Sequence, residues 1–493
     1  SHPVVLWPLQ IQQAKYYSHE MGVLKLPVRQ RFEPKAALQI RLATVPDIPF
    51  QKLKLDTLHF YLMGIGEVPM LLYEQLFTNS TGVCLQSISL PSRWQKTLDK
   101  DCIRPVGFEP EESLLPYDPR SFQGYRLLQE YFAFPQRFMF FEISGLRSAL
   151  NNCSESQLDL IIPFDDSKNI LESSVTSNNF SLFCTPAINL FRKKADRIHI
   201  SDRFSEFHVV PDRTRPEDYE VFSITQVLGY ESQTEVPYKF FPFYSIRDRA
   251  PEGSRRFYSV NRIPRPLSER QKRMGRRSNK YSGTEVYLTL ADETSPPYHP
   301  DLKQLEVDTL CTNRDLPLHI PINQGTTDFT LEQTIPYNQI RCVGFPSEPK
   351  PSLAEHDIAW HAINHLSVNY LSLSDTDGGS GVSALKDILF LYAEDRDIQI
   401  ANQINGIKEI QTKPIIRRVN TGGPLAFGRG LEITIVLEEE KFTGTGIFLF
   451  GRVLEQFFSR YVSVNSFTET VIRTVERGEI VRWPARIGIK ETL

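Results

Sequence analysis

The stretch Leu114-Leu115-Pro116-Tyr117, then Ser121-Phe122-Gln123-Gly124-Tyr125-Arg126-Leu127-Leu128-Gln129-Glu130-Tyr131-Phe132-Ala133-Phe134-Pro135 and Phe138-Met139-Phe140-Phe141, is the densest feature of the chain. Eight of the twenty residues from 122 to 141 are aromatic, against 11% of the whole chain. Ser121 is a suitable cap for a helix that carries Leu128, Tyr131 and Phe132 on one face and stops before Pro135. The pattern predicts a short aromatic helix followed by a strand, which locks either a domain core or an interface.

A second amphipathic helix is predicted from about Phe448 to Tyr461. Its apolar positions repeat at helical spacing, whereas Arg452, Glu455, Gln456 and Ser459 are expected to face away from the apolar side. An apolar stripe of this kind usually faces the core of its own domain, so core packing is favoured over an interface. The candidate structural or interface residues from both helices are Phe122, Tyr125, Tyr131, Phe132, Phe134, Leu454, Phe457, Phe458 and Tyr461.

Most of the remaining sequence is typical of short strands. Residues 38–42, 285–290 and 431–437 alternate apolar and polar side chains, as half-buried strands do. The 34 prolines and many Asn, Asp and Gly residues supply the breaks between such strands. Further helices are expected after Val68-Pro69 and after a cap at Ser383. The sequence therefore predicts an α+β fold that is predominantly β, with several linked β-rich domains and a few amphipathic helices.

The length of 493 residues indicates more than one domain. Breaks in composition suggest three parts. Residues 1–150 form an N-terminal β-rich domain that ends in the aromatic block, and residues 151–305 form a middle β-rich domain with a basic loop at about 254–282. Residues 306–493 form a C-terminal α+β domain.

The bulk composition is that of an ordinary globular protein, with 40% hydrophobic and 23% charged residues. A net charge of −3 creates no global field that would recruit nucleic acid or an anionic membrane. The six cysteines are widely spaced, which indicates free thiols rather than zinc knuckles or a disulfide framework. No run approaches the roughly 18 apolar residues of a membrane helix, and no signal peptide is evident. Because the sequence begins at Ser1 rather than Met, we expect it to be part of a longer gene product.

The motifs that suggest catalysis or metal binding are incomplete. Ser383-Ala384-Leu385-Lys386 matches the S-x-x-K pattern of penicillin-binding enzymes, but the S-D-N and K-T-G elements are missing. His361 and His365 have the spacing of a zinc protease without its glutamate, so packing or surface histidines are the default and a metal site the alternative. Since no nucleophile elbow occurs either, the sequence predicts no catalytic, cofactor or metal residue.

Residues 255–280 carry ten Lys and Arg residues, with Phe257 and Tyr258 near the start. Basic charge with aromatics can bind nucleic acid, but no nucleic-acid-binding fold motif accompanies it. A solvated loop, or one that meets an acidic protein, is the favoured interpretation. The glycine runs at 422–423, 428–430 and 444–446 lack the P-loop pattern and are typical of tight turns.

The aromatic block resembles the TssF family (also called VasA or ImpG) of type VI secretion baseplates. The likeness continues, in order, through 188–191, 206–212, 257–259, 283–288, 310–317, 365–373, 427–434, 448–458 and 461–468. The family normally begins with a helical segment before the element Leu6-Trp7-Pro8, and this sequence lacks that segment. Its role is therefore not assigned to this sequence.

The resemblance implies a structural wedge subunit without cofactor or catalytic residue. Two copies would bind one TssG to form a wedge, which would also hold TssE and the TssK adaptor. The wedges would surround a VgrG hub. The resemblance also implies a cytoplasmic baseplate that docks on the envelope-spanning complex at the inner membrane, with no small-molecule substrate, no nucleic acid and no insertion into the membrane. The alternative from the residues alone is a β-rich glycan-binding or hydrolytic envelope protein, which would need a pocket with convergent carboxylates.

Overall fold

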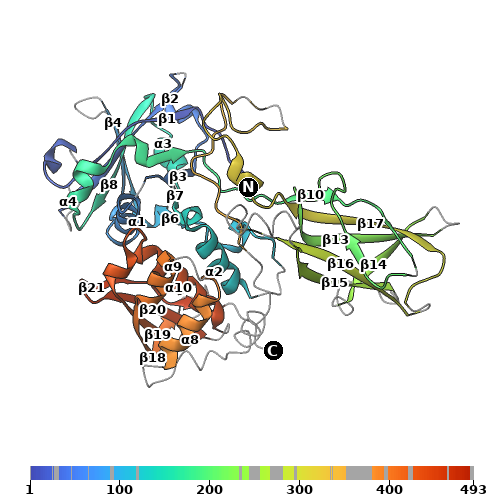
Figure 1. Cartoon of the computed structure of the whole chain (residues 1–493). Coiled ribbons are helices and arrows are strands. Elements are labelled where there is room, and N and C mark those ends of the chain that lie inside the picture. Colours follow the sequence, from blue (N-terminus) through green and yellow to red (C-terminus); the bar gives the residue numbers. More distant parts are fainter. Residues whose placement is uncertain are drawn as a thin grey trace. The chain divides into compact units, whose positions relative to one another are not determined.

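The computed structural model of the chain describes residues 2–24, 26, 33–45, 47–64, 66–88, 94–117, 122–201, 203–231, 236–243, 256–266, 281, 283–293, 297–332, 335, 337–350, 380–393, 398–419, 426–462 and 466–488. The chain forms two compact units (Figure 1). Unit 1 combines Ser1–Ala187 with Leu353–Leu493, and unit 2 consists of Ile188–Ser352. Unit 1 is therefore built from both ends of the chain, and unit 2 is a continuous insertion.

The N-terminal part of unit 1 contains two antiparallel sheets among its described residues. The first has the order β1 (Leu9–Tyr17), β2 (Ala36–Thr44), β8 (Gln157–Phe164), β4 (Gly82–Ser87) and β5 (Gln95–Asp99). The second has the order β6 (Ile103–Val106), β7 (Phe140–Ile143), β3 (Leu58–Leu62) and β9 (Phe180–Leu182). In the second sheet Phe60 lies opposite Phe141, and their rings stack with centroids 5.0 Å apart. Cross-strand aromatic pairs of this kind help to fix register.

Helices join these sheets to the rest of unit 1. They are α1 (Val68–Thr78), α2 (Gln123–Ala133), α3 (Leu146–Leu150) and α4 (Asn169–Ser174). Single 3₁₀ turns occur at η1 (Met21–Leu24), η2 (Phe50–Lys52), η3 (Lys100–Cys102), η4 (Pro110–Glu112), η5 (Pro135–Phe138) and η6 (Ser177–Asn179). Pro69 stands in the first turn of α1, where its missing N–H costs no hydrogen bond. The sequence predicted two helices in this part of the chain, and both are present as α1 and α2.

The C-terminal part of unit 1 places helices beside a mixed sheet. The described strands are β18 (Ile407–Val419), β19 (Ala426–Leu437), β20 (Ser466–Thr474) and β21 (Gly478–Arg482) in that order, and β22 (Arg486–Ile487) pairs with β20. The helices are α8 (Ser380–Phe390), α9 (Ile398–Asn405) and α10 (Ile447–Tyr461), with a 3₁₀ turn at η9 (Glu439–Phe442). Strands β19 and β20 run parallel, and α10 lies in the crossover between them.

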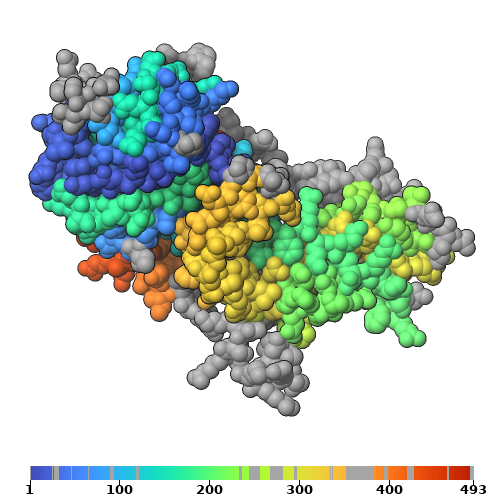
Figure 2. Space-filling model, turned by 90° about the horizontal axis from the view of Figure 1, so that it is seen from above, coloured from blue at the N-terminus to red at the C-terminus, as the bar shows by residue number. Residues whose placement is uncertain are grey.

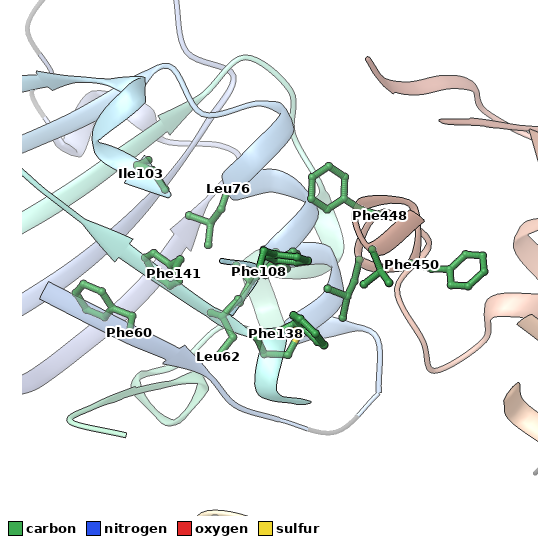
Figure 3. Close-up of a cluster of buried hydrophobic side chains, with 14 of the residues drawn as sticks. Phe60, Leu62, Leu76, Ile103, Phe108, Phe138, Phe141, Phe448 and Phe450 are labelled. Carbon is green, nitrogen blue, oxygen red and sulfur yellow. The ribbon is translucent and has the colours of Figure 1, made fainter. Parts of the chain in front are cut away.

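The main core of unit 1 includes side chains from both parts of the chain. Leu76 of α1, Phe141 of β7 and Phe450 of α10 all belong to one cluster of buried residues. In Figure 3, Phe448 and Phe450 leave α10 on different sides, and Phe448 points toward the N-terminal part. Phe448 lies 5.8 Å from Tyr73 of α1 and 5.5 Å from Trp483, measured between ring centroids. Figure 2 shows N-terminal (blue) and C-terminal (orange-red) surfaces adjoining in unit 1.

Unit 2 is a β unit with its own core. Its described strands have the order β10 (Phe191–Lys194), β17 (Leu302–Thr312), β13 (Glu220–Glu231), β14 (Tyr238–Pro242), β15 (Arg256–Pro264), β16 (Thr284–Asp292) and β12 (Phe207–Val209), and β11 (Ile198–His199) pairs with β17. A 3₁₀ turn, η8 (Leu316–His319), follows β17. Along β16 every second side chain is buried, from Thr284 to Asp292, as expected for a strand with one face on a core.

The α+β, predominantly β fold is confirmed, whereas some local expectations are not. Helix α8 begins at Ser380, so Ser383 lies inside the helix and is not its cap. The compact units divide the chain after Ala187 and after Ser352, whereas the sequence-based boundaries stand after residues 150 and 305. The second of those boundaries lies within β17. The boundaries differ because the chain leaves unit 1 and later returns to it, whereas the sequence analysis treated each domain as one continuous segment.

Candidate functional site: the α2–α10 helix pair

The predicted aromatic helices α2 and α10 pack against each other inside unit 1. The ring of Phe122 lies 5.9 Å from Phe457 and 5.2 Å from Tyr461, in edge-on geometry. Tyr125 also lies 5.9 Å from Phe457. Edge-on aromatic pairs each contribute roughly 0.5–1.5 kcal/mol beyond the area that they bury. The two helices are 324 residues apart between Gln123 and Ile447, so this contact closes unit 1 over a long sequence separation.

A glycine permits the close approach of these helices. A Cβ atom on Gly124 would lie 2.9 Å from the Cδ2 atom of Phe457 and would also meet the ring of Phe122. Phe457 is fully buried. The backbone of α2 therefore contacts α10 directly at Gly124.

The nine candidate residues lie at or beside this helix pair. Six of them are buried, namely Tyr131, Phe132, Leu454, Phe457, Phe458 and Tyr461. The other three, Phe122, Tyr125 and Phe134, are half-buried. The buried six pack within this chain, and only the half-buried three retain surface that another chain could contact. Two thirds of the set are thus buried within this chain.

Polar contacts extend the helix pair to its neighbours. The Tyr131 hydroxyl donates to Gln403 Oε1 of α9 at 3.2 Å, and burial raises the pKa of Tyr131 above its ordinary range. Burial raises the pKa of Tyr125 as well, and a hydrogen bond with the hydroxyl of Tyr461 adds to the shift. These tyrosines therefore stay protonated at physiological pH and act as hydrogen-bonding core residues.

A buried ion network lies beneath α2. Glu130 is 3% exposed and accepts from Arg126 Nη1 at 3.1 Å and from the backbone N–H groups of Leu114 and Leu115, each at 3.0 Å. Its second oxygen pairs with Arg137, which is 1% exposed. Removing one partner of such a pair leaves an uncompensated buried charge and typically costs about 3–5 kcal/mol. The network fixes the chain on both sides of the aromatic block.

The arginines of this region also bind backbone carbonyls. Arg137 Nη2 donates to Gly107 O at 2.8 Å and to Glu112 O at 2.6 Å. Arg460 of α10 donates to the carbonyl of Phe108. Burial lowers the pKa of Arg137 to about 9 and that of Arg460 to about 10, and in both cases the charge of Arg126 adds to the effect. Residues 107–112 are thereby tied to the 3₁₀ turn η5, which follows α2, and to α10.

The polar side of α10 is buried, which contradicts the expectation that it faces away. Glu455, Gln456 and Ser459 are 3%, 1% and 1% exposed. Glu455 pairs with Arg452 and with Arg486, each at 3.2 Å, and Arg486 also donates to Gln456 Oε1 at 3.2 Å. The cover comes from the C-terminal strand β22, which the periodicity of α10 does not reveal. Buried polar groups in proteins nearly always have a hydrogen-bond partner, and Glu455 and Gln456 follow this rule.

A further ion pair links the two ends of the chain. Arg477, in the turn between β20 and β21, donates from Nη1 to Glu74 Oε1 of α1 at 2.6 Å and also pairs with Glu439. Burial alone would lower the pKa of Arg477, but the two carboxylates outweigh it and leave this pKa above its ordinary value. The contact is a second clamp between residues 1–187 and 353–493.

Other candidates from the sequence do not form a site here. His361, His365 and most of the basic loop at 254–282 lie outside the described residues. Within the described part, no group of three or more His, Cys, Asp or Glu side chains could hold a metal ion. None of the six cysteines, all of which lie in the described part of the chain, forms a disulfide bond, as predicted. None of the described helices has the length and apolar character needed to cross a membrane.

Sequence reasoning missed the arginine–glutamate network. The spacing of Arg126 and Glu130 by four residues is a helical ion-pair signal that could have been found. Nothing in the sequence around Arg137 or Arg460 indicates burial, because their partners come from the loop at 107–112 and from another helix.

Comparison with known proteins defines the class. A sequence profile of the type VI secretion system TssF family matches residues 1–490. The type VI secretion system component TssF1 of Pseudomonas aeruginosa is 47% identical over 494 aligned residues, which cover 100% of this chain and 79% of that protein. A chain in the cryo-electron microscopy structure of the type VI TssK–TssF–TssG baseplate subcomplex shares the fold, with a TM-score of 0.73 and 23% identity over 99% of this chain and 83% of that one.

These matches define a component of the type VI secretion system. Within that system the chain belongs to the TssF family.

Proposed function

We propose that this chain is a non-enzymatic scaffolding subunit of the baseplate wedge, which assembles with TssG and TssK. The observation that carries the proposal is the family match over residues 1–490, together with 47% identity to a TssF1 protein along the whole chain. TssK and TssG are the proteins named with TssF in the subcomplex whose TssF chain shares this fold. The wedge contains two copies of this chain per TssG and also TssE, and it borders the VgrG hub.

The construction of unit 1 supports a role as a stiff scaffold. Its two parts share one core and are clamped by Arg477 with Glu74 and by Arg460 with the Phe108 carbonyl. Such interiors are close-packed and transmit strain rather than absorb it. A compact unit of this kind moves as a rigid body when interfaces rearrange, which suits a machine that contracts.

The charged groups of the helix pair support a structural rather than a catalytic role. Glu130 and Glu455, both 3% exposed, are each held by arginines within the chain. A catalytic carboxylate needs access to substrate, and these two have none. This burial supports a structural role for both carboxylates, in keeping with the proposal that the protein works without cofactor or small-molecule substrate.

We further propose that the protein acts in the cytoplasm, in a baseplate docked at the cytoplasmic face of the inner-membrane complex. It binds no nucleic acid and does not insert into the membrane. The net charge of −3 supports the second of these statements, because a chain with a small negative net charge is not attracted overall to DNA or to an anionic lipid surface.

Co-expression with TssG tests the proposal. The mass of the purified complex, measured by light scattering, should correspond to two copies of this chain and one TssG. Val475→Ser, which changes a surface side chain that is 66% exposed, should leave the mass unchanged and serves as the control. A chain that stays monodisperse and free of TssG would overturn the proposed role.

A further inference from the structure

The β18–β19 hairpin has one face that belongs to the core of unit 1. Its register runs without a shift from Glu409↔Val436 to Val419↔Ala426. Because side chains two residues apart on a strand point to the same side, Ile410, Ile416 and Arg418 share a face with Phe427 and Arg429 of the opposite strand. Ile410 is 6% exposed and belongs to the main core. The face that begins in the core therefore continues to the far half of the hairpin.

The far half of the hairpin leaves the core. None of the residues from 411 to 418 is buried. On the core-derived face, Ile416 is 65% exposed and Phe427 is 76% exposed. Their partners across the ladder are Arg429 for Ile416 and Arg418 for Phe427, so the two apolar side chains are diagonal neighbours within reach of each other. We name these four residues the arm face; the hairpin is orange in Figure 1.

The two faces of the hairpin differ in how their charges are paired. On the opposite face, Arg417 pairs with Glu469 at 3.2 Å, and Arg482 pairs with Glu469 at 3.0 Å and also with Glu432. On the arm face, Arg418 and Arg429 have no ion pair with any described residue. The arm face thus presents an exposed isoleucine and an exposed phenylalanine. They lie between two guanidinium groups that have no carboxylate partner among the described residues.

We propose that the arm face docks an acidic segment of another baseplate protein. The segment would set an apolar side chain against Ile416 and Phe427 and would bring Asp or Glu side chains to Arg418 and Arg429. Apolar contact supplies affinity and the charge pairs supply register, as at other protein interfaces. A second copy of this chain would not fit face to face, because four arginines would then meet without a carboxylate.

This inference rests on the proposed function, and one experiment separates the two. The tagged full-length protein is co-expressed with TssG, TssK, TssE and VgrG, and the retained amount of each is measured. Two double variants of the arm face are compared with wild type. The first combines Ile416→Ser and Phe427→Ser, and the second combines Arg418→Glu and Arg429→Glu. Both pairs change exposed residues, and tryptophan fluorescence checks that the variants remain folded. The matched controls are Ile398→Ser, which is 74% exposed, and Arg147→Glu, also at an exposed position.

Each arm variant should lower the retention of the same single partner by at least about tenfold, the loss expected for a central contact, while the controls match wild type. Raising the salt concentration should weaken the wild-type contact, since exposed ion pairs are screened. Wild-type retention of every partner by both arm variants would overturn the inference and leave the proposed function intact. Failure of wild type to retain any partner would overturn the proposed function itself.

Two further outcomes would identify a different occupant. Binding of a single-stranded 20-mer oligonucleotide by wild type, lost in both arm variants, would make the surface a nucleic-acid site instead. A dimer of the purified chain that both variants break would make it a self-association surface. Fluorescence anisotropy and light scattering distinguish these results from protein docking.

Discussion

Units 1 and 2 reach a stable core by different routes. Unit 2 is continuous from residue 188 to 352, and its core draws on strands between β11 and β17. Unit 1 joins residues 1–187 to 353–493, and its main core combines Leu72 of α1, Leu127 of α2 and Phe450 of α10. Closing a long loop costs entropy, so the contacts between the two ends must repay it. The difference teaches that unit 1 depends on contacts between its two chain segments, among them the α2–α10 pair and the ring contact of Tyr73 with Phe448.

One ion pair from each unit illustrates a difference in burial. Unit 1 buries the Glu130–Arg137 pair almost completely, whereas the pair of Lys194 and Glu306 in unit 2 has a lysine side chain that is 59% exposed. Buried pairs are costly to break, and exposed pairs contribute little. Changes to unit 1 should therefore have larger and more cooperative effects than similar changes to unit 2.

Separating the units gives the largest expected effect. Residues 188–352 expressed alone should unfold cooperatively, because a continuous segment with its own core can fold independently. Residues 1–187 alone should fail to fold, since α2 would lose Phe457 and α10. Circular dichroism during thermal unfolding measures both. Co-expression of 1–187 with 353–493 is the control and should restore a folded unit 1; a cooperative transition of 1–187 alone would contradict the comparison.

Glu130→Ala should destabilise unit 1 by about 3–5 kcal/mol. The change leaves Arg126 and Arg137 without their carboxylate and removes the acceptor of two backbone N–H groups. All four tryptophans of the sequence lie within the ranges of unit 1, so their fluorescence during urea unfolding reports on that unit alone.

The matched control for this change is Glu479→Ala. Glu479 pairs with Arg482 at the surface, with a side chain that is 46% exposed. Its loss should cost less than about 1 kcal/mol. Equal effects of the two substitutions would show that burial of the Glu130 network does not matter.

Gly124→Ala should destabilise unit 1 by about 1–3 kcal/mol, the usual cost of overpacking a core. Alanine gains up to about 1 kcal/mol of helix propensity, but the new Cβ would meet the ring of Phe122 and would lie 2.9 Å from the ring of Phe457, which is fully buried. Gly22→Ala is the control, since no atom lies within 4 Å of its added Cβ. The same fluorescence measurement applies, and a more stable Gly124→Ala protein would mean that α2 and α10 are not in direct contact.

The smallest expected effect concerns pH. Burial alone would raise the pKa of Glu469, but hydrogen bonds from Arg417 and Arg482 outweigh it and leave this pKa below its ordinary value. A lowered folded-state pKa contributes stability that is complete above the unfolded pKa of about 4.3 and is lost as pH falls below it. Glu469→Gln should therefore cost about 0.5–1 kcal/mol at pH 7 and less at pH 3. A cost independent of pH would contradict this role.

The sequence predicted the elements of the α2–α10 pair but not what covers them. Aromatic density and helical spacing were enough to find α2, α10 and six side chains that are buried. Periodicity along α10 could not show that Arg486 of β22 covers Glu455 and Gln456, because the cover comes from outside the helix. In the same way, nothing near Arg137 marks it as the partner of Glu130.

Domain borders were the least predictable feature. Residues 150 and 305 follow breaks in composition, but the chain re-enters unit 1 after residue 352 and brings α10 to a helix more than 300 residues earlier. Such a return depends on long-range packing, and local propensity carries no trace of it. The resemblance of the motifs to TssF, by contrast, was readable from the sequence because the motifs follow one another along it.

Native-state hydrogen exchange of the full chain with Phe457→Ala tests most directly whether unit 1 is one body built from both chain ends. Phe457 is fully buried between α2 and α10, and its truncation should cost about 3–5 kcal/mol. We predict that α2 and α10 lose protection together and by equal free energies, while β13, β16 and β17 of unit 2 keep theirs. Loss of protection in α10 alone, with α2 unchanged, would contradict the account.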